Sequence, residues 1–553
     1  MALLCGACCA LQACGGGGGA SSPVAPLNPS SPPPAPASAS IRVSGLSPFP
    51  ANCAPSNGET LYLNSEVEPY LVVSPTNARV TVGVWQQDRW SGGGARGILV
   101  ARSVDGGSTW SMPIPPALSD CMGGAPGSVG YQRASDPWLA YSSDGATLYQ
   151  SALALTTGTS SAVLVSASSD DGQTWSVPTA VVRDAPDIVF NDKESISADP
   201  LAPNIAYVTW DRSTADVPAM LARTTDRAVS WQPMQLLFDP GSGYATIGNV
   251  IVGLNGGGPL GTLIDCFTQY PVSGVANLRA IRSTNQGQTW PANTATTIAA
   301  LNSVQTRDPF TGLPVRDGSI LGTFAADPRP GSTTLYAAWE DATPVANQDH
   351  NAIVLSRSGD GGATWSTPLL VNGDPTVPAF NPSIAVRSDG EIGLRYYDFR
   401  GALAGAAIPV SVWLARSSDG GSTWVESQID GPFDLTNAPI VQGQLFLGDY
   451  EGFTGANTEF LSFYAKVVSG STGPTDIFFD PANVPFGMAA HAAQARRYAA
   501  APLAGRTAST RLKQEAAENL RRSLMHRFGR DATRENRTAT HPSGATAPRA
   551  RAR

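Results

Sequence analysis

An eight-residue pattern occurs six times along this chain of 553 residues. It reads Ser or Thr, any residue, Asp, any residue, Gly, any residue, Thr or Ser, Trp, and its first copy is SVDGGSTW at 103–110. The other copies begin at residues 168, 224, 283, 358 and 417, with Ala228 in place of one Gly and Asn285 in place of one Asp. Their Trp residues lie 65, 56, 59, 75 and 59 residues apart. A period near 60 residues corresponds to one four-stranded sheet with its loops.

The chemistry of the pattern fits a turn between two strands. Asp accepts hydrogen bonds from turn amides, Gly adopts a positive φ, and Trp packs the turn onto its own sheet. Each copy follows a short apolar or alternating run, such as GILVA at 97–101. The chain also has 57 Gly and 45 Pro, which disfavours long helices. Six turns in phase therefore predict a repeated all-β architecture.

These repeats resemble the Asp-box, or BNR, repeats of the sialidase superfamily over roughly residues 60–480. The resemblance implies a β-propeller of four-stranded antiparallel blades. In that family each Asp box joins the third and fourth strands of a blade, on the face away from the active site. We therefore expect Asp105, Asp170, Asp360 and Asp419 to be structural rather than catalytic.

Candidate inner strands favour seven blades, and six is the alternative because sialidases typically have six. The candidates are Pro69–Val73, Pro137–Tyr141, Glu194–Ala198, Ile247–Gly253, Ser319–Ala325, Pro382–Val386 and Leu445–Gly448. The last set lacks a fourth strand, which we expect Ala39–Ser47 to supply. Closure of the ring in this way removes free sheet edges.

The segments outside the propeller predict export. Residues 1–14 are an apolar signal peptide whose end, LQAC, is similar to a bacterial lipobox, so Cys14 is the expected lipidation site. No Lys or Arg precedes the apolar stretch, which leaves a non-lipidated signal peptide as the alternative. Residues 15–40 are a Gly/Ser/Pro/Ala tether, 41–487 the propeller, and 488–553 a basic, largely disordered tail. The expected location is the bacterial cell envelope or the secreted fraction.

Charge and rare residues exclude several classes of function. From His491 onward the chain has 14 Lys or Arg against 4 Asp or Glu, whereas the rest has 22 against 40. An acidic body disfavours nucleic acid as a partner. With one His in the body, multi-His metal sites are excluded, and no cofactor is expected. Ca²⁺ would suit an acidic rim, but no EF-hand-like spacing supports it.

Cys53 and Cys121 are able to form a disulfide in an oxidising compartment. Their spacing alone does not decide whether they do.

The loops opposite the turns are expected to hold the site. An aromatic residue followed by Asp or Glu and then Arg or Asp recurs at the end of second strands, as in TWDR at 209–212. By the resemblance, a sialidase needs Arg residues for the sugar carboxylate, a Tyr nucleophile made basic by a Glu, and an Asp as acid/base. The substrate-binding candidates are Arg89, Arg212, Arg400, Arg316 and Trp90. The nucleophile pair is Tyr450 with Glu451 or Glu194, or else Tyr397, and the acid/base is Asp88 or Asp136. In the competing interpretation, the Asp and Arg residues pair and brace neighbouring blades.

One departure from the family weakens the choice of sugar. The first-blade Arg motif is absent, and residues 66–70 read EVEPY. The sequence predicts an exported, monomeric glycoside hydrolase that removes terminal sugars, sialic acid first among them, from a glycan or glycoconjugate. Its membrane contact is expected only through a lipid anchor. The alternative is a non-catalytic propeller that binds glycan or protein at the cell envelope.

Overall fold

The computed structural model describes residues 40–499 apart from 55, 57, 123–129, 157–160, 185–188, 215, 257–260, 272–274, 292–294, 402, 471–472 and 483–495. The predicted signal peptide with Cys14, the tether up to residue 39 and most of the basic tail lie outside the described residues. No helix among the described residues is long and apolar enough to cross a membrane.

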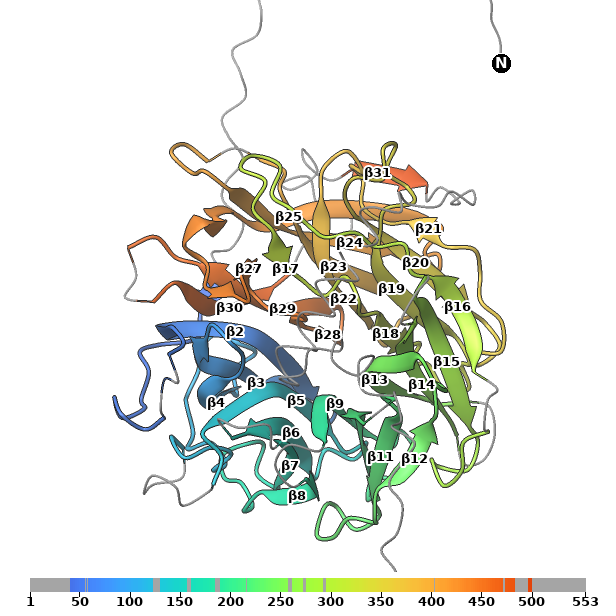
Figure 1. Ribbon diagram of the computed structural model, residues 1–553. Helices are drawn as coiled ribbons and strands as arrows, with labels where there is room; N and C mark the ends of the chain where they lie inside the picture. The colour runs from blue at the N-terminus through green and yellow to red at the C-terminus, as the bar shows by residue number, and fades with distance from the viewer. Residues whose placement is uncertain are drawn as a thin grey trace, which may run out of the picture. The chain divides into compact units, whose positions relative to one another are not determined.

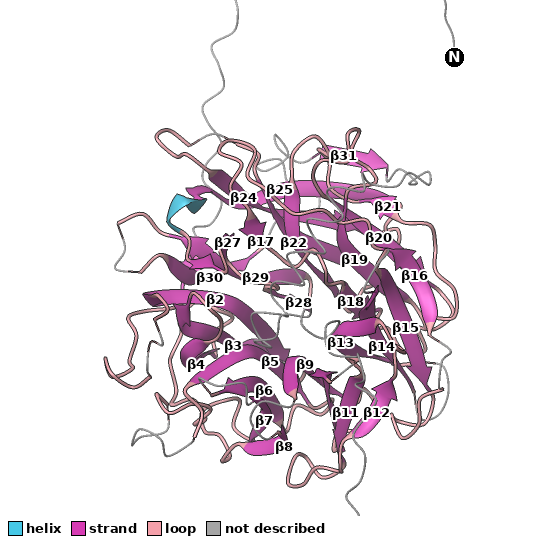
Figure 2. Cartoon of the chain, in the orientation of Figure 1, coloured by secondary structure: helices cyan, strands magenta, loops and turns pink. Residues whose placement is uncertain are grey.

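Apart from one 3-10 turn, all the regular secondary structure of the described chain is β-strand (Figures 1 and 2). The first strands are β1 (Ile41–Arg42), β2 (Leu61–Ser74), β3 (Asn77–Trp90), β4 (Ala95–Ser103), β5 (Arg133–Tyr141), β6 (Leu148–Leu155), β7 (Ser161–Ser168), β8 (Thr179–Arg183), β9 (Phe190–Ala198), β10 (Ala206–Ser213), β11 (Ala219–Thr224) and β12 (Gln235–Phe238). They continue with β13 (Tyr244–Leu254), β14 (Thr262–Pro271), β15 (Asn277–Ser283), β16 (Thr296–Ala300), β17 (Val315–Arg316), β18 (Thr323–Ala326), β19 (Leu335–Asp341), β20 (Ala352–Ser358), β21 (Leu369–Leu370) and β22 (Ala379–Val386). The last are β23 (Ile392–Asp398), β24 (Pro409–Ser417), β25 (Thr423–Asp434), the 3-10 turn η1 (Leu435–Asn437), β26 (Ile440–Val441), β27 (Gln444–Phe446), β28 (Gly452–Ala456), β29 (Glu459–Val467), β30 (Thr475–Pro481) and β31 (Arg496–Ala499).

The sheets radiate from a centre, which confirms the predicted β-propeller (Figure 1). The innermost strands contact one another in a closed ring, in the order β2, β5, β9, β13, β18, β22, β28 and back to β2. Each is followed outward by antiparallel partners, as in β9, β10, β11 and β12. One hydrogen-bonded sheet runs from β2 to β8, because Ala95 of β4 pairs with Ala134 of β5. A single hydrogen-bonded sheet can therefore contain two inner strands, so the number of sheets does not give the number of blades. The blade number stays a prediction.

The ring is closed by the segment that precedes the first blade. Ile41 of β1 pairs with Phe479 of β30, so the outermost strand of the last sheet comes from the start of the propeller, as expected for Ala39–Ser47. The expected inner strand at Leu445–Gly448 is wrong. Gln444–Phe446 forms β27 in a small sheet with β17 and β26, and β28 is the innermost strand of the last set. In the predicted tail, β31 pairs with β25.

The six repeated turns share the hydrogen bonds of their first Ser or Thr and of their Asp or Asn, whereas the indole bond of the Trp occurs in the first and fifth turns. In the first, the Thr109 N–H and hydroxyl donate to the two carboxylate oxygens of Asp105 at 2.9 and 2.6 Å. The Gly107 N–H donates to the Ser103 hydroxyl at 2.8 Å, and the Trp110 indole donates to the Gly107 carbonyl at 3.0 Å. Hydrogen bonds from Thr109 and then Ser103 lower the pKa of Asp105 to about 2. The carboxylate therefore works as an anion that organises its own turn.

Large aromatic side chains fill the space between sheets. Trp85, Trp210 and Trp339 lie on second strands and have no exposed surface. Burial of such a side chain removes roughly 150–250 Å² from water. This core fixes the spacing of the sheets and thereby the geometry of the inner strands.

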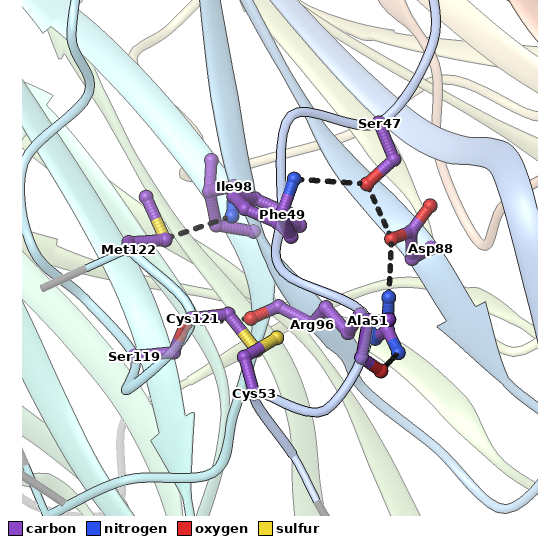
Figure 3. The surroundings of a disulfide bond; sticks show 10 residues. All are labelled: Ser47, Phe49, Ala51, Cys53, Asp88, Arg96, Ile98, Ser119, Cys121 and Met122. Atoms are coloured by element: carbon purple, nitrogen blue, oxygen red, sulfur yellow. Dashed lines mark hydrogen bonds and ion pairs between the residues drawn. A yellow bond between two sulfur atoms is a disulfide. The ribbon is translucent and has the colours of Figure 1, made fainter. Parts of the chain in front are cut away.

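A disulfide anchors the segment before the first blade. Cys53 and Cys121 are bonded, which joins the chain ahead of β2 to the connection between β4 and β5 (Figure 3). Their separation of 68 residues makes this a long-range cross-link. Cys266 is a buried free thiol.

Candidate active site

Five inner strands share an irregularity at the same place along the strand. Each has two residues opposite one residue of the neighbouring strand, and the first of the two has a positive φ between 48° and 68°. These first residues are Glu68, Asp136, Lys193, Gly248 and Asn381. A bulge re-aims a side chain, and the left-handed conformation costs a non-glycine residue roughly 1–3 kcal/mol. Repetition of this strained feature around the ring marks the axis as a candidate site.

A cavity of about 130 Å³ lies among these bulges. Its polar lining includes Asp136, Lys193, Glu194, Asp449 and Tyr450. Its apolar lining includes Leu321, Phe324, Ile384 and Phe453. The site is thus a polar group of side chains facing an apolar wall, which is typical of small-molecule sites.

Three aromatic rings form one side of this axial cavity. Tyr70 and Trp138 lie with their ring centroids 4.4 Å apart, and Trp138 lies 5.3 Å from Tyr450. Each ring comes from a different inner strand or the segment just before one. The rings are tilted by 36° and 46° at these two contacts, which fix them relative to one another as an aromatic wall against which a sugar ring is able to pack.

An ion-pair network joins the bulges across the axis. The Lys193 ammonium lies 2.5 Å from Asp449 and 3.7 Å from Asp136. Arg316 grips Asp449 with two hydrogen bonds of 3.0 and 2.7 Å. Burial by itself raises the pKa of Asp449, but Arg316 and Lys193 outweigh it and hold that pKa below its usual range. Asp449 is therefore an anion with two cations of its own.

Glu194 differs from the other carboxylates of the cavity. It is 1% exposed, and neither carboxylate oxygen has a hydrogen-bond partner within the part of the chain that the structure describes. Burial, and then the charge of Asp136, raise the pKa of Glu194 well above its usual value. Glu194 consequently favours its protonated form more than an ordinary carboxyl group does, and it lines the cavity.

Tyr450 lies next to these carboxylates. Its hydroxyl donates to the Pro137 carbonyl at 3.4 Å. Burial, and then Glu68 and Asp136, raise its pKa well above the usual value. A phenol in this setting needs a base before it acts as a nucleophile.

A small sheet brings two arginines beside the axis. β17 pairs in parallel with β27, which places Arg316 next to Phe446. The guanidinium groups of Arg89 and Arg316 lie 4.9 and 4.8 Å from the Phe446 ring centroid. Arg89 also lies 4.0 Å from Glu68, whose pKa is raised to about 7 by burial and then Asp136. These contacts are cation–π pairs backed by carboxylates.

Other predicted site residues lie elsewhere. Asp88 accepts hydrogen bonds from Ser47 at 2.6 Å and lies 3.5 Å from Arg96, beside the disulfide (Figure 3). Trp90 is 2% exposed and packs against the disulfide cysteines, so it is not free to stack on a ligand.

The predicted convergence of arginines is not found for Arg212 and Arg400. Arg212 forms two hydrogen bonds with Asp184, at 2.6 and 2.7 Å. Arg400 pairs with Asp398 and with Glu426. Both arginines thus have the carboxylate partners of the competing interpretation, although those of Arg400 lie in its own sheet rather than in a neighbouring blade. Neither arginine lines the axial cavity.

Glu451 and Tyr397 lie together, and of the two only Glu451 lines the axial cavity. The Ala465 N–H donates to Glu451 at 2.9 Å, and Tyr397 donates to the Ala465 carbonyl at 2.6 Å. The other carboxylate oxygen of Glu451, Oε1, is buried without a hydrogen-bond partner among the described residues. Tyr397 has no exposed surface, which leaves it out of reach of a substrate.

Sequence reasoning missed two features of the site. It did not place Lys193 at the axis, where its partners are Asp136 and Asp449. It also overlooked that a polar residue precedes Pro at three of the bulges, namely Glu68-Pro69, Asp136-Pro137 and Asn381-Pro382. That dipeptide is the sequence signal that was available for finding the axis.

No group of three or more His, Cys, Asp or Glu residues that could hold a metal ion is present among the described residues.

No protein-family model matches the chain, and no curated protein matches it. Among solved structures it is similar to a Hadza microbial sialidase, with 13% identity over 73% of this chain and 76% of that one, at a TM-score of 0.39. It is also similar to an α-L-arabinanase of Penicillium chrysogenum (13% identity, 81% and 99% covered, TM-score 0.40) and to a Trypanosoma rangeli sialidase (14%, 67% and 56%, TM-score 0.37). The β-propeller fold is established by the closed ring of inner strands, independently of these similarities.

Proposed function

We propose that this protein is a glycoside hydrolase that removes terminal sugars from glycans in its axial cavity. The observation that carries the proposal is the contrast between Glu194 and Asp136. Glu194 is buried without a partner among the described residues, and burial raises its pKa, whereas Asp136 has the Lys193 ammonium 3.7 Å away. Glycosidic hydrolysis uses two carboxyl groups whose environments differ in this way, one as the acid and the other as the base.

Each group then has a role that its environment supports. Glu194 donates its proton to the glycosidic oxygen as the bond to the anomeric carbon breaks. Asp136 removes the proton from the attacking hydroxyl, which belongs to water or to Tyr450. The sugar stacks on the aromatic side formed by Tyr70 and Trp138. General acid–base catalysis of this kind contributes typically 10²–10⁴-fold to the rate.

The test is hydrolysis of a panel of 4-methylumbelliferyl glycosides by the full chain. The panel includes the sialoside, which the sequence resemblance puts first, together with neutral and uronic acid sugars. Glu194→Gln is expected to lower kcat by at least about 100-fold. Asp265→Asn is the matched control, because Asp265 is also buried and unpartnered among the described residues but does not line the cavity. Full activity of Glu194→Gln, or silence of folded wild type on every sugar, contradicts the proposal.

We also propose export, with Cys14 carrying the lipid. The Cys53–Cys121 disulfide supports an oxidising compartment. Incorporation of labelled palmitate into wild type but not into Cys14→Ser is the expected result. Lack of label in a protein that still reaches the envelope would favour the non-lipidated signal peptide.

A second candidate function is a non-catalytic propeller that binds glycan or protein at the cell envelope. It is favoured by the ion pairs that hold Arg212 and Arg400 away from the axial cavity. In that case the folded chain binds glycans on an array without hydrolysing them, and Glu194→Gln binds as well as wild type.

A further inference from the structure

The cations around the axial cavity are each held by carboxylates of the chain itself. Arg316 makes its two-bond grip on Asp449, the arrangement in which a guanidinium holds the carboxylate of a ligand. Lys193 reaches Asp449 and Asp136. Arg89, on the far side of Phe446, lies beside Glu68. The place that the carboxylate of an acidic sugar would take is thus filled by Asp449.

We infer that the axial cavity selects an uncharged sugar, because Asp449 already occupies its cationic grip. This rests on the proposed function and names the substrate class of the same site. An acidic sugar would bring a further carboxylate next to Asp449 and Asp136, in a buried place where like charges repel strongly. A neutral sugar brings hydroxyl groups, which accept hydrogen bonds from the Glu194 carboxyl and leave the ion pairs intact.

The remaining surface of the cavity agrees with this substrate class. Leu321, Phe324, Ile384 and Phe453 face the polar groups and offer no charge to an acidic substituent. Asn249 and Asn381 also line the cavity and add neutral amide groups to it. Specificity then comes from shape and neutral hydrogen bonds rather than from charge.

The test uses pairs of substrates that differ only by one carboxylate. The 4-methylumbelliferyl β-glucoside is compared with the β-glucuronide, and the α-galactoside with the α-galacturonide, beside the sialoside. Wild type is expected to prefer the neutral member of a pair by at least about tenfold in kcat/KM. Asp449→Asn frees Lys193 and Arg316, so it is expected to shift that ratio toward the acidic member by at least about tenfold. Preference of wild type for an acidic sugar overturns the inference and leaves the glycosidase proposal standing.

Measuring which sugar the protein binds shows whether the inference fails or the proposed function fails. If no sugar is hydrolysed, the proposed function fails, and saturation-transfer NMR with glucose and glucuronic acid decides the inference. Binding of glucose without glucuronic acid supports it, whereas preference for glucuronic acid, or no binding of either, overturns it.

If Asp449→Asn does not fold, the salt dependence of wild type decides instead. Turnover or binding that is insensitive to added NaCl is expected for a neutral ligand, and a steep loss with salt overturns the inference.

Discussion

Tyr397 and Glu451 bind the same residue from two sides. Tyr397 donates its hydroxyl to the Ala465 carbonyl at 2.6 Å, and the Ala465 N–H donates to Glu451 at 2.9 Å. Burial raises the pKa of Glu451 to about 8 despite the nearby Arg395 guanidinium. This carboxyl is therefore neutral in the folded protein at a pH where it is ionised in the unfolded chain.

Glu451→Gln is expected to flatten the pH dependence of stability. The unfolded carboxyl ionises near pH 4.5 and the folded one near 8, so its contribution is fully present below pH 4.5 and is lost as the pH rises to about 8. Within that window one such group changes the free energy of unfolding by at most about 1.4 kcal/mol per pH unit. Urea unfolding at pH 5, 6, 7 and 8 measures the slope. Asp419→Asn is the control, because its lowered pKa leaves it ionised in both states across this range. An unchanged slope in Glu451→Gln would contradict the prediction.

The fourth repeated turn provides a natural comparison for the Asp of the others. Asn285 accepts from the Thr289 N–H at 3.1 Å and donates to its hydroxyl at 2.8 Å, so an amide completes the turn. We expect Asp360→Asn to be nearly neutral and Asp360→Ala to lose about 1 kcal/mol, as for loss of a side-chain cap. Thermal unfolding measures both, and kcat is expected to be unchanged because the turn does not line the axial cavity. Equal loss in the two variants would show that charge, rather than hydrogen bonding, organises the turn.

Removal of the disulfide is expected to lower stability without altering the axial cavity. Cys53 and Cys121 are 68 residues apart, and a loop of that length gives up to about 4 kcal/mol in the chain-entropy account. The double variant Cys53→Ser/Cys121→Ser is compared with wild type in urea, each with and without reductant. Wild type with reductant is expected to match the double variant. A difference between those two would point to packing around Trp90 rather than to the cross-link.

The sequence was sufficient for the fold because its signals are local and repeated. Each turn contains its own Trp together with an Asp or Asn and a Gly or Ala, and the apolar runs around Trp85, Trp210 and Trp339 form second strands. The inner strand expected at Leu445–Gly448 failed for the opposite reason. An apolar LFLG run has the composition of a strand, but its partner, β17, lies more than a hundred residues earlier and is found only in three dimensions.

The candidate site was only partly predictable because the bulges break the alternation of strands. Asp136, Glu194 and Tyr450 were named and line the axial cavity. Sequence position identifies which residues lie near a rim, but a bulge on an inner strand reverses which of its residues face the axis. Sequence position also does not separate inner strands from second strands at that rim. Asp88 and Arg212 lie on second strands, where they pair with Arg96 and Asp184.

Tyr450→Phe separates the two routes left open by the proposed function. The phenol has a pKa raised by burial and by Glu68 and Asp136, and its hydroxyl is only 3.4 Å from the Pro137 carbonyl, so forming its anion is costly. Its ring, however, packs at 5.3 Å from Trp138 and is retained by Phe. We expect kcat to fall by less than about tenfold with KM little changed, since general acid–base groups account for the larger factor. Steady-state kinetics and a search for a pre-steady-state burst measure this. A loss above 100-fold, together with a burst in wild type that Phe abolishes, would make Tyr450 the nucleophile and Asp136 the base that activates it.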